Sequence, residues 1–109
     1  MVNIRRKLRI PIIMEIKEFG KRVENKGFEE PFKMVCKVSP IFNLEMLWMV
    51  DEYKVTIYDK KRGRGYIMKK KFTSDEPKSG DYITMNVIKM VESMVWKIAK
   101  TGCKNNILR

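Results

Sequence analysis

The residues best suited to chemistry in this chain are the cations and aromatic rings that crowd one segment of its second half. Eight Lys or Arg residues fall between Lys54 and Phe72, against the single acid Asp59. The rings that interleave with them are Tyr53, Tyr58, Tyr66 and Phe72. Cations attract phosphates, and rings offer faces on which unpaired bases stack. The segment therefore predicts a surface that binds nucleic acid.

The same segment predicts a β-hairpin. Residues 53–59 and 65–72 contain the aromatic and β-branched side chains that strands favour. Between them lies KKRGR at 60–64, a basic turn in which Gly63 can adopt a positive φ at little cost. This hairpin would project its cationic turn into solvent.

The sequence allows two registers for this hairpin. One sets Tyr58 opposite Tyr66 and Lys54 opposite Lys70 on the exposed side. A slip of one residue sets Lys54 opposite Lys71 instead and changes the sides of the second strand. Both registers keep Lys54 and Tyr58 exposed. Ordinary cross-strand packing is the competing role for each tyrosine.

The composition supports a folded domain with a polyanionic partner. The chain has 109 residues, of which 44% are hydrophobic, and a net charge of +11. This length predicts one domain with a modest core, for which a homodimer would add burial. The charge favours nucleic acid as the partner.

The remaining segments predict an α+β fold. We expect a curved antiparallel sheet of four to five strands, with a C-terminal amphipathic helix packed on one face. The further strands are expected at 10–19, 32–38 and 81–85, by alternation of apolar and polar residues. Residues 39–50 suit either a helix or a buried strand, and we favour the strand. Cys36 and Trp48 are expected in the core.

The C-terminal helix is predicted by apolar residues three and four positions apart. Asn86 is a candidate N-cap, and Gly102 is placed to end the helix. The stripe expected to face the core is Val87, Met90, Val91, Met94, Val95 and Ile98. The domain organisation is then a basic arm at 1–9, one nucleic-acid-binding domain at 10–102 and a basic tail at 103–109.

The apolar runs and the two cysteines of the chain indicate where the protein is located. No apolar run reaches the length of a membrane span, so no membrane span is expected. Cys36 and Cys103 are distant from each other in sequence and lie outside any motif, which favours free thiols, although one bridge between them stays open. We expect a cytoplasmic or otherwise intracellular protein.

From Tyr53 onward, the order of parts is YKVTIYD, KKRGRG, YIMKKKF, SDEPKSG, DYITM and NVIKMVESMVWKIAK. Residues 53–101 thereby resemble the single-stranded-DNA-binding domain of the transcriptional coactivator positive cofactor four and small viral and archaeal proteins of similar build. The resemblance implies a curved four-stranded sheet followed by one helix, in a dimer formed through both. A viral source would place the protein in the host cell. The long N-terminal half departs from that family.

The resemblance also implies a function, which is single-stranded DNA binding with little sequence specificity. Bases would stack on the concave sheet, and the cations of its β-ribbon would hold the phosphates. Carried onto this sequence, the binding residues are Lys54, Tyr58, Lys60, Lys61, Arg62, Arg64, Tyr66, Lys69, Lys70 and Lys71.

We expect no enzyme, no metal and no cofactor. The chain has no histidine, and it has no glycine-rich phosphate loop. A magnesium-dependent nuclease is the competing enzyme hypothesis, with Asp51, Glu52, Lys54 and Asp59 as its candidates. The basic ribbon would also suit binding of duplex DNA or RNA, and the spread of charge would suit a virion or structural protein that coats a genome.

Overall fold

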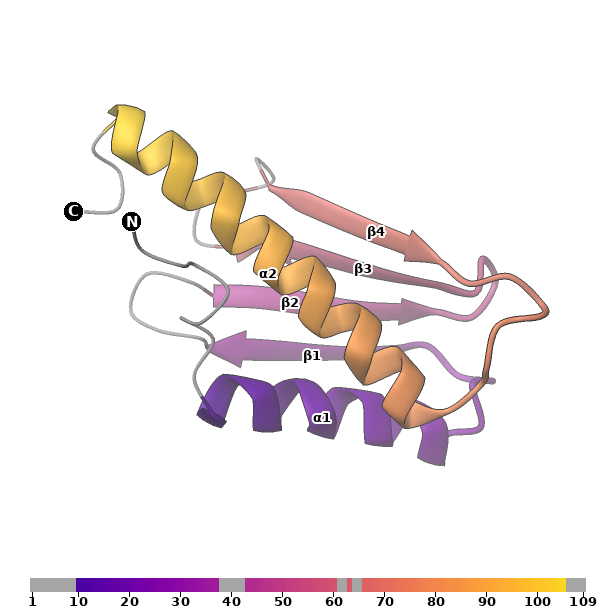
Figure 1. The fold of residues 1–109 in the computed structure, drawn as a ribbon. Coiled ribbons are helices and arrows are strands. Elements are labelled where there is room, and N and C mark those ends of the chain that lie inside the picture. Colours follow the sequence, from indigo (N-terminus) through magenta and orange to yellow (C-terminus); the bar gives the residue numbers. More distant parts are fainter. Residues whose placement is uncertain (1–9, 38–42, 61–62, 64–65, 106–109) are drawn as a thin grey trace.

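The computed structural model describes the backbone of residues 10–37, 43–60, 63 and 66–105, and the side chains of 12–36, 43–60, 63 and 66–97. The described chain forms a helix, four strands and a second helix (Figure 1). These elements are α1 (Ile10–Asn25), β1 (Phe32–Lys37), β2 (Asn43–Met49), β3 (Lys54–Asp59), β4 (Ile67–Lys71) and α2 (Gly80–Asn105). The predicted α+β class, with an antiparallel sheet and a C-terminal helix, is confirmed.

The four strands form one antiparallel sheet in sequence order, β1-β2-β3-β4. In the β3–β4 hairpin Lys54 lies opposite Lys71 and Tyr58 lies opposite Ile67. The hairpin is therefore confirmed in its second register, and the register that paired Tyr58 with Tyr66 is wrong. Gly63 has a φ of 67° in the turn, as predicted. Lys61, Arg62 and Arg64 lie outside the described residues.

Both helices cover the same face of the sheet. Alternate strand residues, among them Met46, Trp48 and Ile57, are fully buried and join the apolar stripes of α1 and α2 in one core. Figure 1 shows α2 crossing the sheet diagonally while α1 runs beside β1. Because both helices lie on one side, neither of them covers the other side of the sheet.

The segment expected to be the first strand is a helix. The buried residues of α1 are Ile12, Ile16, Phe19 and Val23, which recur at helical spacing. Pro11 is tolerated because it stands in the first turn, where its missing N–H is not needed. The helix continues through Gly20 to Asn25.

The strand expected at 81–85 is the start of α2. Ser79 caps this helix, since its Oγ accepts a hydrogen bond from the Tyr82 N–H at 3.2 Å. Asn86, the predicted N-cap, lies inside the helix, and its side-chain amide donates to the Tyr82 carbonyl at 2.9 Å. Nor does Gly102 end the helix, which continues to Asn105.

The other core predictions that fall on described side chains are confirmed, and Ile98 lies outside them. Residues 43–49 of the ambiguous segment form a strand, and Trp48 and Cys36 are both fully buried. Burial, reinforced by the nearby Glu15 carboxylate, raises the pKa of the Cys36 thiol to about 12. The thiol is thus protonated at neutral pH and acts as a small apolar core residue.

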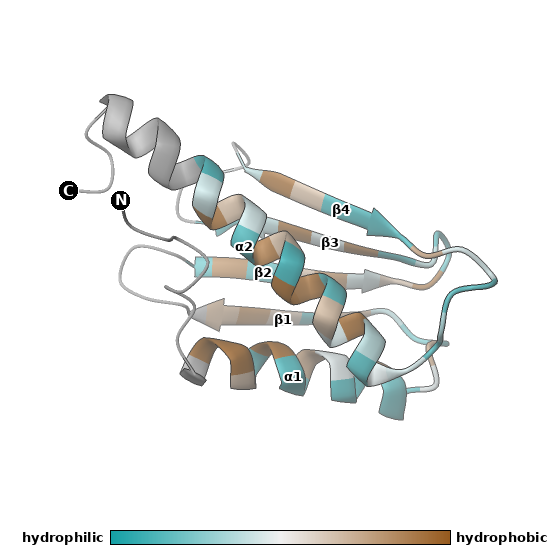
Figure 2. Cartoon of the chain, viewed as in Figure 1, coloured by the Kyte–Doolittle hydropathy of each residue, from teal (hydrophilic) through white to brown (hydrophobic). Residues whose placement is uncertain are grey.

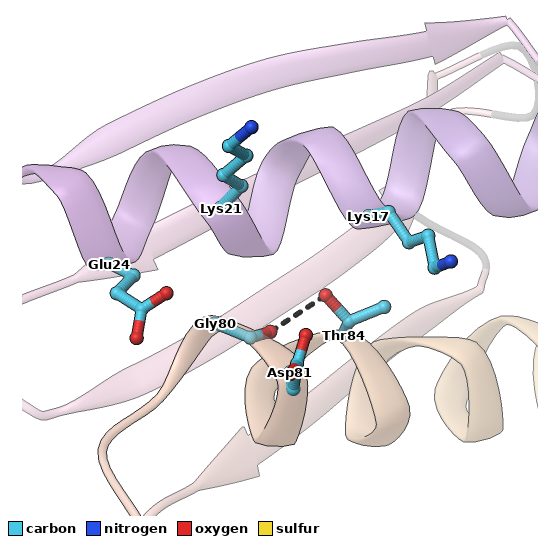
Figure 3. A pocket seen from close by; sticks show the side chains of 6 residues that line it. All are labelled: Lys17, Lys21, Glu24, Gly80, Asp81 and Thr84. Atoms are coloured by element: carbon cyan, nitrogen blue, oxygen red, sulfur yellow. Dashed lines mark hydrogen bonds between the residues drawn. The ribbon is translucent and has the colours of Figure 1, made fainter.

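The two helices meet at a pair of glycines. A Cβ on Gly20 would come within 2.5 Å of the Gly80 carbonyl oxygen and would also collide with Thr84. A Cβ on Gly80 would in turn lie 2.8 Å from the Gly20 carbonyl oxygen. Figure 3 shows this junction, where the Thr84 hydroxyl donates to the Gly80 carbonyl at 2.7 Å. The absence of side chains at both positions lets the helix backbones touch.

Gly20→Ala should therefore destabilise the protein even though alanine favours helices. Overpacking of this kind costs about 1–3 kcal/mol, which lowers the melting temperature by several degrees in a domain of this size. Thermal unfolding followed by circular dichroism measures the change. Lys21→Ala, at the next and exposed position, is the control and should leave the melting temperature almost unchanged. Equal stability of Gly20→Ala and wild type would contradict the close crossing.

Candidate nucleic-acid interface

The candidate interface is the side of the sheet that neither α1 nor α2 covers, which we call the open face. The register aligns its residues in three rows across the strands. The rows are Met49, Lys54 and Lys71; Lys33, Leu47, Thr56 and Lys69; and Val35, Glu45, Tyr58 and Ile67. Lysines stand at both edges of the middle row, and apolar side chains lie between and beside them.

A cluster of three lysines occupies the β3–β4 end of this face. Lys54 lies directly opposite Lys71, and Lys69 is next to Lys71 on the same side of β4. Figure 2 shows β4 changing from hydrophobic at its start to hydrophilic at its end. Like charges directly opposite each other destabilise a sheet, so this arrangement has an energetic cost.

Glu52 offsets part of that repulsion. Its carboxylate accepts a hydrogen bond from the Lys54 ammonium and forms an ion pair with it. The pKa of Glu52 is lowered, chiefly by this hydrogen bond and further by the charges of Lys54, Lys71 and Lys69. Lys69 and Lys71 lie on the solvent side of β4, and both are exposed.

A buried carboxylate lies at the centre of the open face. The Glu45 side chain is 6% exposed although it points away from both helices. Tyr58 donates its hydroxyl hydrogen to Glu45 Oε1, and the ammonium groups of Lys33 and Lys60 each lie 3.7 Å from Oε2. The pKa of Glu45 is lowered, first by the Tyr58 hydrogen bond and then by the two lysine charges.

The rings of the segment do not share one surface. Tyr58 is half-buried on the open face, whereas Phe72 is buried on the helix side and Tyr66 packs against the core. Tyr53 packs against Trp48 and Phe72, with ring centroids 5.0 Å and 6.3 Å away. Tyr58 is thus the one ring that the described part of the chain places on the open face.

Lys70 also lies off this face. It points to the helix side of β4, where its ammonium pairs with Glu76 at 2.9 Å and lies 5.1 Å from the Phe72 ring centroid. Glu76 additionally accepts hydrogen bonds from the Tyr82 hydroxyl at 2.6 Å and the Thr73 N–H at 2.7 Å. Lys70 therefore holds the β4–α2 connection in place.

Of the ten predicted binding residues, the structure places four on the open face, which are Lys54, Tyr58, Lys69 and Lys71. Lys60 follows β3 and reaches the same face through Glu45. Tyr66 and Lys70 belong to the other side. Lys61, Arg62 and Arg64 are in the undescribed part of the turn.

The carboxylates of the nuclease hypothesis do not come together. Asp51 and Glu52 precede β3, whereas Asp59 ends it and is fully buried on the helix side. Six residues of strand separate the two ends by about 20 Å. In the part of the chain that the structure describes, no group of three or more acidic or Cys side chains could hold a metal ion. None of its helices is long and apolar enough to cross a membrane.

A pocket of about 290 Å³ lies on the helix side, at the junction of α1 and α2. Its lining includes the cations Lys17 and Lys21 and the carboxylates Glu24 and Asp81 (Figure 3). These opposite charges balance, so the pocket has no preference for a polyanion. The open face, with five lysines and two carboxylates on it or at its rim, is the better candidate among described surfaces.

Two members of this site, Lys33 and Glu45, were absent from the sequence prediction. Alternation within residues 32–38 would place Lys33 on the exposed side of its strand, but nothing in the sequence shows that this strand belongs to the same sheet as the hairpin, with β2 between them. Glu45 is the one charge in the apolar strand NLEMLWM. A lone buried acid requires charged or hydrogen-bonding partners, which is the signal that could have identified it.

Comparison of the chain with protein-family models, curated proteins and solved structures finds no match. The resemblance of residues 53–101 to the family of positive cofactor four stays a prediction.

The Glu76 network should make stability depend on acid pH. The hydrogen bond from Tyr82, followed by those from Thr73 and Lys70, lowers the pKa of Glu76 from 4.5 to about 2. A depressed pKa stabilises the folded state fully above pH 4.5, and this contribution disappears as the pH falls toward 2. Glu76→Gln should therefore melt below wild type at pH 7, and the difference should shrink between pH 4.5 and 2.

Melting curves at about pH 7, 5, 4 and 3 measure this effect across the window in which the linked carboxyl titrates. Glu29→Gln, which removes an exposed carboxylate from the α1–β1 connection, is the control for a general loss of acidic charge. A stability difference between wild type and Glu76→Gln that stays constant over this whole range would show that the network contributes through neutral contacts alone.

Proposed function

We propose that the protein binds single-stranded DNA with little sequence specificity, through the open face of its sheet. The observation that carries this proposal is the alternation of lysine edges with an apolar floor. Lys33 stands on β1 and Lys69 and Lys71 on β4, about 14 Å apart across four strands. Between them lie half-buried or exposed apolar side chains, which are Val35, Leu47, Met49 and Ile67.

This combination suits an unpaired strand better than a duplex. A single strand presents both phosphates and the apolar faces of its bases, whereas a duplex hides those faces in its stack. Lysine edges match the phosphates, and the apolar floor with the Tyr58 ring matches the bases. Lysines contacting phosphates carry no sequence information, so specificity should be low.

Base stacking should contribute less to binding, and phosphate contacts more, than the sequence suggested. Only Tyr58 is available as a described stacking ring on this face, so phosphate contacts supply most of the affinity. Binding should then depend steeply on salt, with a slope of log K against log salt of about −0.7 for each phosphate contact. A homodimer stays part of the proposal, and no catalytic step is included.

Replacing Lys69 and Lys71 with glutamine should weaken binding to oligothymidine and flatten the salt slope by up to about 1.4, because two phosphate contacts are lost. Fluorescence anisotropy of a labelled oligonucleotide at several salt concentrations measures both quantities. Lys17→Gln with Lys21→Gln is the matched control, since it removes equal charge from exposed positions on α1.

The control pair separates this function from genome coating by diffuse charge. If both double variants weaken binding equally, the open face is not the site and genome coating gains support. A wild-type preference for a duplex of equal length over the single strand, at the same salt, would favour the ribbon in a groove instead.

Tyr58→Ala should reduce affinity for the single strand by roughly 5- to 150-fold, the effect of losing about 1–3 kcal/mol of base stacking. Tyr58→Phe keeps the ring and should bind far better than Tyr58→Ala. Isothermal titration with oligothymidine compares the three proteins, and circular dichroism confirms that each is folded. Wild-type affinity in Tyr58→Ala would show that this ring contacts no base.

A further inference from the structure

The carboxylate of Glu45 is surrounded by cations that face outward. Lys33 and Lys60 reach the same oxygen, Oε2, and their side chains are 61% and 46% exposed. Lys33 is on β1, one row away from Glu45, and Lys60 follows β3 on the opposite side. The two lysines therefore straddle a carboxylate that is itself almost fully covered.

These ion pairs leave the lysines able to bind something else. At 3.7 Å each N···O separation is long for a hydrogen bond, and each ammonium carries three N–H donors, so donors remain for a further acceptor. Two ammonium groups against one carboxylate also leave an excess positive charge. Both ammonium groups lie 3.7 Å from the same carboxylate oxygen of Glu45, so the oxygens of one phosphate could contact both of them.

Glu45 also holds the aromatic ring beside the two lysines. Tyr58 lies directly opposite Glu45 in the register, and its hydroxyl donates to Glu45 Oε1. The hydrogen bond restricts the rotation of the ring and holds it beside the two ammonium groups. One carboxylate thus sets the position of two cations and one ring.

We propose that Glu45 organises Lys33 and Lys60 into a subsite for one phosphate of the bound strand, with the adjoining base on the Tyr58 ring. This inference rests on the proposed function and adds Lys33 and Glu45 to it. Glu45 is a positioning residue, since it contacts the lysines and the tyrosine rather than the ligand. Its role resembles that of a carboxylate behind a metal-bound histidine, which orients the group that makes the contact.

The subsite predicts opposite effects for two acids of the same surface. Loss of either acid makes the protein more positive, so the long-range field alone would tighten binding in both cases. Glu52→Gln should indeed tighten it, because Lys54 is released. Glu45→Gln should instead weaken it severalfold, because the lysines lose their common anchor, and should flatten the salt slope by about 0.7, one phosphate contact.

The experiment is an anisotropy titration of oligothymidine with wild type, Glu45→Gln, Glu52→Gln, Lys33→Gln/Lys60→Gln and the triple variant that adds Glu45→Gln to that pair. In the triple variant most of the weakening by Glu45→Gln should disappear, because the two lysines through which it mainly acts are gone and only its contact with Tyr58 remains. A purely structural role of Glu45 would weaken both backgrounds alike. Tighter binding by Glu45→Gln would overturn the inference and leave the proposed function intact.

A second measurement does not require a nucleic-acid strand. Pyrophosphate titrated into isotope-labelled protein should shift the NMR signals of Lys33 and Lys60 in wild type and much less in Glu45→Gln. If oligothymidine does not bind but these shifts occur, the proposed function fails and the phosphate subsite stands. Absence of both binding and shifts would overturn both.

Discussion

Burial of one side of the sheet under two helices is the constraint on which the other features depend. Four strands in sequence order offer two faces, and α1 and α2 both cover the one that carries Met46, Trp48 and Ile57. Both helices fit there because Gly20 and Gly80 allow their backbones to touch. The close crossing lets both helices pack into one core on the same side of the sheet.

As a consequence, the cations and the aromatic rings are divided between the two faces of the sheet. In a strand, neighbouring residues point to opposite sides. The cations of KKK in β4 are accordingly split, with Lys69 and Lys71 on the open face and Lys70 turned toward Glu76. The rings are divided too, since Tyr53 and Phe72 stabilise the core beside Trp48. A segment that looks uniformly suited to nucleic acid in sequence thus supports two tasks, and only part of it can contact a ligand.

Period-two patterns made the sheet predictable, and tertiary contacts explain the failures. Residues 32–37 and 54–59 alternate clearly, so their strands and inward residues could be inferred. The first helix was missed because Gly20 signals a break, and only the approach of the distant Gly80 shows why glycine is needed there. The start of α2 was missed because DYITM alternates by chance, while the cap is Ser79. Within the site, Lys54 and Tyr58 were identifiable from the hairpin. Lys33 and Glu45 needed the pairing of β1 with β2, a register that the sequence leaves undetermined.

The two carboxylates of the open face fix the positions of the lysines around them. The arrangement of the cations is therefore defined, although nothing in it would distinguish one base sequence from another. Glu52 reduces repulsion between Lys54 and Lys71, which would otherwise oppose pairing of β3 with β4. Glu45 does more, because it is buried and shared by partners from β1, β3 and the turn. A buried carboxylate that lacked these cations would be costly, so folding and the placement of Lys33 and Lys60 are coupled. The positions of the cations are then part of the folded structure rather than the outcome of ligand binding. If a phosphate binds there, as we propose, preorganised cations lose less side-chain entropy, which would be the physical reason for an acid on this face.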